Sequence, residues 1–136
     1  MAEAEGIPPT ASTASVGVGI NYVGNWVYAY SGPVSCDNNE TTLLDFRTQA
    51  TIIQTRIVLN YSEVGAFAED FLFKIQLNSE IVMQMIYDGA KLQEPPQWVP
   101  LLIPPNTNLK ITAVNVTDTD ARLMAAMLTG RVYGAV

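Results

Sequence analysis

Apolar and polar residues alternate with a period of two along much of this chain. The alternation is most regular between residues 71 and 77, where the apolar positions are Phe71, Phe73, Ile75 and Leu77. Successive side chains of a β-strand point to opposite faces of a sheet, so this pattern is typical of a strand with one buried face. With turn residues as boundaries, the sequence predicts eight strands: Trp26–Ser31, Glu40–Phe46, Ala50–Tyr61, Phe71–Leu77, Glu80–Tyr87, Trp98–Ile103, Leu109–Val116 and Arg122–Tyr133.

Short turns separate the predicted strands. Residues 104–108 read Pro-Pro-Asn-Thr-Asn between two apolar runs. Proline fixes φ and asparagine tolerates left-handed geometry, so the turn is specified locally. Asn78 and Ser79 are expected to form a two-residue hairpin turn, and residues 35–39 to form a loop. Many short strands divided by turns predict an all-β protein, either a sandwich or a barrel.

One segment has a composition that also suits a helix. Residues 121–128 read Ala-Arg-Leu-Met-Ala-Ala-Met-Leu and are rich in strong helix formers, with Gly130 just beyond them. The residues that follow, Arg131 to Tyr133, resemble a strand instead. Tertiary contacts can override helix propensity, and we predict a strand across the whole segment.

The first 19 residues differ in composition from the rest. They are rich in small residues, and the candidate contact residues among them are Ile7, Pro8, Pro9 and Val16. Such a segment cannot bury enough apolar surface to fold alone. It is therefore either a disordered tail or an extended arm that orders against a partner, with these four residues as its contacts. The predicted domain organisation is an arm at 1–19 and a sandwich domain at 20–136.

Two of the predicted strands are apolar on both faces. They contain the apolar residues 81–83 with 85–86, and the apolar residues 123–128, whereas a strand in a two-layer sandwich normally exposes one polar face. Contact with another subunit would cover the second apolar face, and methionine adapts well to such contacts. The predicted interface residues of a homotrimer are Val82, Met83, Met85, Ile86, Met124 and Met127.

The charge and cysteine content exclude several classes of partner. The formal net charge is −6, and the seven Lys and Arg residues are scattered singly, so neither nucleic acid nor an anionic membrane is an expected partner.

Cys36 is the single cysteine, which excludes an intrachain disulfide and fits synthesis in a reducing cytoplasm. Residues 1–5 lack the apolar core of a secretory signal, and no run of about 20 apolar residues is present to span a membrane.

The sequence contains no recognisable catalytic constellation. Histidine is absent, which removes the commonest general base and metal ligand, and Cys36 therefore has no basic partner of that kind. Asp118 and Asp120 offer two oxygens for Ca²⁺, but the EF-hand pattern is missing and a solvated turn is the favoured interpretation. We expect no catalytic, metal or cofactor site and no enzymatic activity. The aromatic stripe Trp26, Tyr28 and Tyr30 is interpreted as core or interface, with stacking on sugar rings as the alternative.

The closing strands carry a resemblance to a known family. Residues 101–111 (LLIPPNTNLKI) and 127–134 (MLTGRVYG) look like the closing strands of viral jelly-roll proteins. In size, arm and sandwich layout the chain is similar to the small decoration, or cement, proteins of tailed bacteriophage capsids. This resemblance implies a single eight-stranded jelly-roll-like β-sandwich. It also implies trimers on the outer capsid surface, held by N-terminal arms on the major capsid protein.

The main alternative is a receptor- or carbohydrate-binding head of a viral fibre or spike. Its site would be the stripe at Trp26 or the loops that connect the strands. A glycan array separates the two hypotheses, because a cement protein is expected to bind no glycan. A third hypothesis, a hydrolase on a β scaffold, is disfavoured by the absence of histidine.

Overall fold

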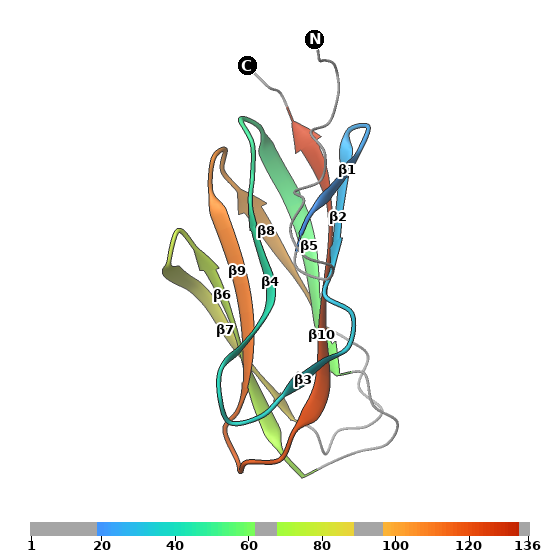
Figure 1. Ribbon diagram of the computed structural model, residues 1–136. Helices are drawn as coiled ribbons and strands as arrows, with labels where there is room; N and C mark the ends of the chain where they lie inside the picture. The colour runs from blue at the N-terminus through green and yellow to red at the C-terminus, as the bar shows by residue number, and fades with distance from the viewer. Residues whose placement is uncertain (1–18, 62–67, 89–96, 134–136) are drawn as a thin grey trace.

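The protein is an all-β sandwich of two antiparallel sheets (Figure 1). The computed structural model describes residues 19–61, 68–88 and 97–133. Its ten strands are β1 (Asn21–Val23), β2 (Trp26–Tyr30), β3 (Val34–Cys36), β4 (Thr41–Arg47), β5 (Ile52–Tyr61), β6 (Asp70–Leu77), β7 (Glu80–Asp88), β8 (Gln97–Ile103), β9 (Asn108–Asn115) and β10 (Arg122–Tyr133). This described part contains no helix that is long and apolar enough to cross a membrane.

Strands from the two ends of the described chain pair with one another. The six-stranded sheet has the order β1-β2-β10-β5-β8, with β3 also pairing with β10, and the four-stranded sheet has the order β4-β9-β6-β7. The pairs are nested: β6 with β7, β5 with β8, β4 with β9 and β2 with β10. This is one long hairpin rolled into two layers, which is the arrangement of a jelly roll.

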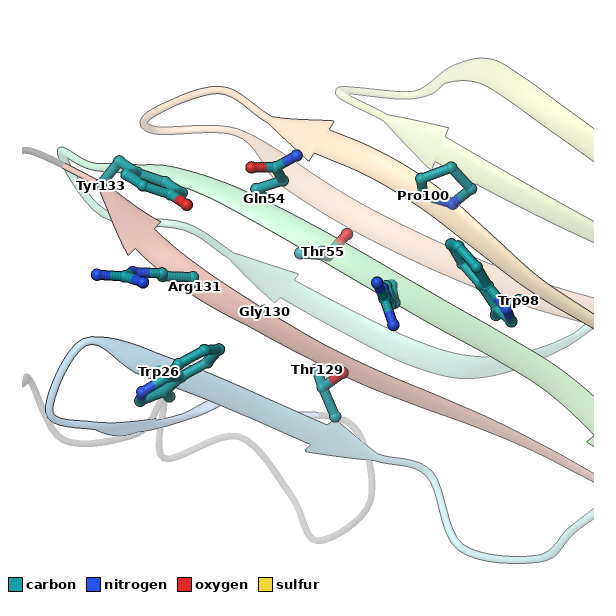
Figure 2. Close-up of a pocket in the computed structure, with 10 residues that line it drawn as sticks. Trp26, Gln54, Thr55, Trp98, Pro100, Thr129, Gly130, Arg131 and Tyr133 are labelled. Carbon is teal, nitrogen blue, oxygen red and sulfur yellow. The ribbon is translucent and has the colours of Figure 1, made fainter.

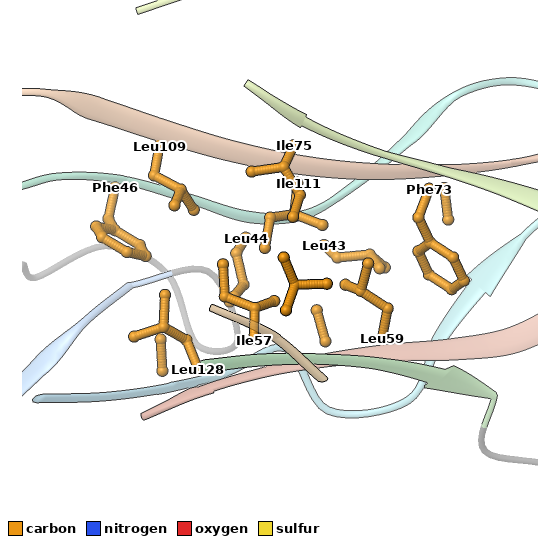
Figure 3. Packing of buried hydrophobic residues seen from close by; sticks show 14 of the residues in the cluster. Leu43, Leu44, Phe46, Ile57, Leu59, Phe73, Ile75, Leu109, Ile111 and Leu128 are labelled. Atoms are coloured by element: carbon orange, nitrogen blue, oxygen red, sulfur yellow. The ribbon is translucent and has the colours of Figure 1, made fainter. Parts of the chain in front are cut away.

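The core lies between the two sheets and is almost entirely apolar. The predicted inward face of β6 is confirmed for Phe71, Phe73 and Ile75, which are buried, while Leu77 is half-buried. From the opposite sheet, Ile57, Leu59 and Leu128 pack into the same cluster (Figure 3). Burial of this many large side chains is the main term that stabilises the fold.

All eight predicted strands are present, but the expected number of eight is wrong. β1 and β3 were not predicted, and β3 lies partly in the segment expected to be a loop. β3 has only three residues, and it forms because Val34 to Cys36 pair with the start of β10. Such a short strand has no period of its own, so its partner decides its conformation. The segment at 122–133, for which a helix was the competing interpretation, is a continuous strand.

The turn chemistry agrees with the sequence. Asn78 and Ser79 both have positive φ, as a type I′ hairpin turn between β6 and β7 requires. Asn106 also has positive φ, in the turn between β8 and β9. The backbone of Asn108 accepts a hydrogen bond from the Asn78 amide and donates one to the Asn78 side chain, which joins neighbouring turns.

Two predictions rest on residues that the structure leaves undescribed. The proposed arm contacts Ile7, Pro8, Pro9 and Val16 lie outside the described residues, as does most of the arm itself. Residues 62–67 and 89–96 are also outside them, and with them part of the strand-connecting segments proposed as the site of a carbohydrate-binding head.

Candidate functional site

The outer face of the six-stranded sheet gathers most of the exposed aromatic side chains. In β2 the alternation buries Val27 and Ala29 and turns Trp26, Tyr28 and Tyr30 outward, so this stripe is not part of the core. The strand register across β2, β10, β5 and β8 aligns three outward rows: Trp26, Arg131, Gln54 and Leu102; then Tyr28, Thr129, Arg56 and Pro100; then Tyr30, Met127, Val58 and Trp98. We call this surface the aromatic–arginine face.

A shallow depression of about 650 Å³ lies on this face. Trp26, Arg131 and Tyr133 stand at one end, and Trp98 and Pro100 at the other (Figure 2). The remaining lining residues are Gln54, Thr55, Arg56, Thr129 and Gly130. Both tryptophans of the chain therefore contribute to one surface.

Both arginines in the depression lie over aromatic rings. The Arg56 guanidinium carbon is 4.5 Å from the centre of the Trp98 ring. The Arg131 guanidinium carbon is 5.6 Å from the centre of Trp26 and 5.5 Å from that of Tyr133. Cation–π contacts of this kind contribute about 0.5–1 kcal/mol each at exposed sites. They hold the charged groups in place.

No acidic residue occurs in any of the six strands of this sheet. The chain has 13 Asp and Glu residues and a net charge of −6, yet β1, β2, β3, β5, β8 and β10 contain none of them. The two arginines of the depression consequently have no carboxylate neighbour on their own strands. The aromatic–arginine face is a locally positive surface on an acidic protein.

Close packing of β10 on β5 supports the floor of the depression. A Cβ added at Gly130 would lie 2.8 Å from the backbone oxygen of Gln54 and 2.9 Å from the Thr55 side chain. Thr55 faces inward and donates a hydrogen bond of 2.8 Å to the backbone oxygen of Leu101 in β8. These contacts fix the spacing of the three strands that carry Arg131, Arg56 and Trp98.

A second apolar surface lies at the edge of the four-stranded sheet. β7 pairs only with β6 among the described strands. Its outward residues Ile81, Val82 and Ile86 are exposed, Ile86 to 56%. The register shifts at this point so that Val82 has no partner in β6, which is a β-bulge. An exposed apolar edge strand is a common site of protein–protein contact.

The six predicted interface residues do not form one surface. Val82 and Ile86 lie on the β7 edge, and Met127 lies on the aromatic–arginine face of the other sheet. Met83 and Met85 are half-buried and pack on the core. Met124 is fully buried in the core of a single chain, so its assignment to an interface is wrong. An all-apolar segment does not reveal which of its residues face inward. In β10, Met124 lies at an inward position.

The carboxylates near Asp118 form an internally bonded turn. Glu69, Asp118 and Asp120 each place an oxygen within 4.8 Å of the others. The Asn115 side chain donates to Asp118 and accepts from the amides of Thr117 and Asp118. The backbone amide of Asp120 donates to the Asp118 carboxylate and, as the main cause, lowers the pKa of Asp118.

Arg122 neutralises part of this carboxylate group. Its Nε donates to Glu69 Oε1 at 3.0 Å, and the Glu69 carboxylate is almost completely buried. Together with the bonds to Asn115, this explains the cluster as a structural link between the start of β6 and the turn before β10.

Cys36 is buried at the end of β3. Burial is the main cause that raises the pKa of its thiol to about 11, and Asp37 adds to the shift. The thiol is therefore protonated at neutral pH and is a poor nucleophile there.

Sequence reasoning identified Trp26, Tyr28 and Tyr30 but missed the rest of the aromatic–arginine face. Trp98, Arg56 and Arg131 are far apart in the sequence and meet only through the strand register. The sequence did contain one indication of this face. Each of these three residues occupies an outward position in the inward–outward alternation of a predicted strand.

Comparison with known proteins gives no family for this chain. No protein-family model matches it, and no curated protein matches it. Among solved structures, the infectious bursal disease virus Gx strain is 11% identical with a TM-score of 0.42, covering 96% of this chain and 39% of that one. A family 35 carbohydrate binding module from Clostridium thermocellum is 13% identical with a TM-score of 0.39, covering 89% and 84%.

Two larger proteins match over a small part of their length. The insecticidal delta-endotoxin Cry8Ea1 from Bacillus thuringiensis is 14% identical with a TM-score of 0.41, covering 75% of this chain. The chain spans 20% of that endotoxin and 11% of the latent PorU from Porphyromonas gingivalis. Similarity at this level does not transfer a ligand or a role to this chain.

Proposed function

We propose that this chain is a non-catalytic structural protein of a virion, which decorates and stabilises a bacteriophage capsid by binding the major capsid protein. The observation that carries the proposal is the β7 edge, where Ile81, Val82 and Ile86 are exposed beside a strand that pairs on one side only among the described strands. Apolar residues in this setting favour docking of another protein, by side-chain burial and by main-chain hydrogen bonds to the edge.

A non-catalytic role is proposed because the chain lacks the side chains that commonly act in catalysis. The chain has no histidine, and the buried Cys36 thiol has a raised pKa. The carboxylates at Asp118 are engaged in a turn. The resemblance to cement proteins supports a homotrimer on the outer surface of the shell, with residues 1–19 as an attachment arm.

The β7 edge is tested with one substitution in the strand and one outside it. Ile86→Glu places a charge at a contact that would exclude water, and we expect binding to undecorated phage shells to fall at least tenfold. Gln49→Glu is the matched control, because Gln49 is an exposed residue between β4 and β5 and the variant adds the same charge outside β7. Cosedimentation with shells and analytical ultracentrifugation measure attachment and trimer formation. Wild-type behaviour of Ile86→Glu in both assays would contradict the proposal.

The arm is tested by deletion of residues 2–18. We expect an unchanged melting temperature and loss of binding to shells, because the segment is poor in apolar surface while Pro8 and Pro9 reduce the entropy lost on docking. A truncated protein that still decorates shells with the affinity of the full chain would show that the arm has no role in attachment.

A further inference from the structure

We propose that the aromatic–arginine face is a binding site for an acidic oligosaccharide. The inference rests on this face alone and goes beyond the resemblance to cement proteins, which implies no glycan binding. Attachment to a capsid is assigned to the β7 edge in the opposite sheet and to residues 1–19, so one chain can carry both functions. The ligand class is a chain of sugar rings that carry carboxylate groups.

The aromatic rings of the depression suit the apolar faces of sugar rings. Trp26 and Trp98 remain about half exposed, although a guanidinium lies over each ring. From the strand register, the two tryptophans are about 20 Å apart across four strands. That span is long enough for several linked sugar rings, with one indole available at each end (Figure 2).

The polar groups between the tryptophans supply hydrogen bonds to hydroxyl and carboxylate groups. Gln54 and Thr129 can donate and accept, and Arg56 and Arg131 carry only donors. A guanidinium binds a carboxylate through two parallel N–H donors, and stacking on an aromatic ring leaves those edges free. Two arginines thus fit a ligand with repeated negative charges.

Charge complementarity identifies the ligand as anionic. The six strands of the sheet contain no Asp or Glu, although the whole chain is acidic. A neutral ligand would not account for this segregation of charge. A second copy docked through the same face about a two-fold axis would bring arginine against arginine, which disfavours a symmetric self-contact.

The shape of the site favours a sugar chain over an acidic peptide. Extended peptides bind sheets mainly at an edge, by main-chain hydrogen bonds. The depression instead lies on the flat face of the sheet, and β2, β10 and β5, three of its four strands, are paired on both sides. It is shallow and open, and it offers no deep pocket for a single anchoring side chain.

The experiment uses the fluorescence of the two tryptophans, since both line the site. The full chain is titrated with an oligogalacturonate, with the same oligomer after methyl esterification, with a heparin oligosaccharide and with poly-glutamate. We expect saturable quenching by the oligogalacturonate, and at least tenfold weaker binding of the esterified oligomer, which lacks the charge. Binding of the heparin oligosaccharide as well would support the site and show that sulfate substitutes for carboxylate.

Variants assign the binding to the face. Arg56→Gln and Arg131→Gln are each expected to weaken oligogalacturonate binding at least tenfold, and Trp98→Ala to weaken it similarly while Trp98→Phe retains most of it. Arg47→Gln is the matched control, because Arg47 is an exposed arginine of the opposite sheet. Melting temperatures identify any variant that fails to fold. If one arginine variant fails to fold, the variant of the other arginine tests the proposal.

Three outcomes would overturn the proposal. The first is no binding of an acidic oligosaccharide at millimolar concentration. The second is binding of poly-glutamate as tight as that of the oligogalacturonate, which would indicate an acidic protein partner. The third is equal loss in Arg47→Gln, which would indicate unspecific attraction. Loss of shell attachment in Ile86→Glu with intact sugar binding separates this site from the proposed capsid contact.

Discussion

The two outer faces of the sandwich have opposite character although both come from alternating strands. On the four-stranded sheet, Thr112 Oγ1 donates to Glu40 at 2.7 Å and Lys74 Nζ lies 3.4 Å from the same carboxylate. Asp45 stands opposite Lys110 and accepts a hydrogen bond from Asn108. The aromatic–arginine face has no carboxylate on its strands and places its arginines over aromatic rings.

The difference shows which charged groups have partners within the protein. Each of these two carboxylates has a partner on the same sheet, so that part of the face needs only water as a neighbour. Arg56 and Arg131 of the other face are exposed and have no acid beside them in the strands of their own sheet. A surface whose charges lack internal partners is a better candidate for ligand binding than one whose charges are paired.

The two outer faces share one core, and Phe73→Ala measures how strongly that core stabilises the fold. Phe73 is completely buried and its ring lies edge-on to Tyr87. We expect a loss of roughly 3–5 kcal/mol in the free energy of unfolding, from transfer energy and a cavity. Urea denaturation measures this. A loss no larger than that from an outer-face substitution would mean that the two layers do not share one core.

Gly130→Ala tests the support beneath the aromatic–arginine face. The added methyl would collide with the backbone of β5, which cannot move as a flexible side chain can. We expect a loss of about 1–3 kcal/mol in the free energy of unfolding, as for other overpacked positions. Ala126→Gly, at another inward position of the same strand, is a control in which a methyl is removed and no clash is created. A Gly130→Ala variant as stable as the wild type would show that β10 and β5 can separate at no cost.

Alkaline pH is expected to weaken the fold through the six-stranded sheet, where Cys36 lies in β3. The thiol titrates near pH 9.0 when unfolded, whereas burial raises its pKa to about 11 in the folded protein. The folded state binds more protons between these values, so stability is greatest below pH 9 and falls as the pH rises toward 11. Urea midpoints across this alkaline range measure the fall. Cys36→Ala should flatten it, and an unchanged slope would assign the loss to other groups such as Tyr22, whose pKa is also raised by burial.

Acid pH is expected to weaken the four-stranded sheet, and by less. The hydrogen bond from Thr112 is the main cause that lowers the pKa of Glu40, with Lys74 adding to it. The lowered pKa contributes stability above about pH 4.5, and this contribution is lost as the pH falls through the folded value. Glu40→Gln should cost less than about 1 kcal/mol at neutral pH, because the carboxylate is partly exposed and screened. Equal acid sensitivity of the variant and the wild type would show that the pairing on this face adds no stability.

Much of the architecture was predictable from the sequence because it is encoded locally. Phe71, Phe73 and Ile75 indicate their strand and its inward face by period alone. The hairpin at Asn78 and Ser79 follows from residues that tolerate positive φ. These features depend on neighbours in the sequence.

The candidate site depends on register, and register is not encoded locally. Arg56 and Trp98 come together because β5 and β8 pair in one alignment out of several that would bury the same apolar face. Likewise, Met124 and Met127 occur in one apolar run, and only the pairing of β10 with β5 decides that the first is buried and the second exposed.

The nested pairing of the strands has a consequence for the order in which the molecule forms. The hairpin of β6 and β7 closes a loop of two residues, so it forms early at little cost in chain entropy. β2 and β10 join residues about a hundred positions apart, such as Tyr30 and Met127. β10 is also the last described strand to leave a ribosome, and it pairs with β2, β3 and β5. Until β10 has been synthesised, β2, β3 and β5 lack their common neighbour, so the aromatic–arginine face is assembled last.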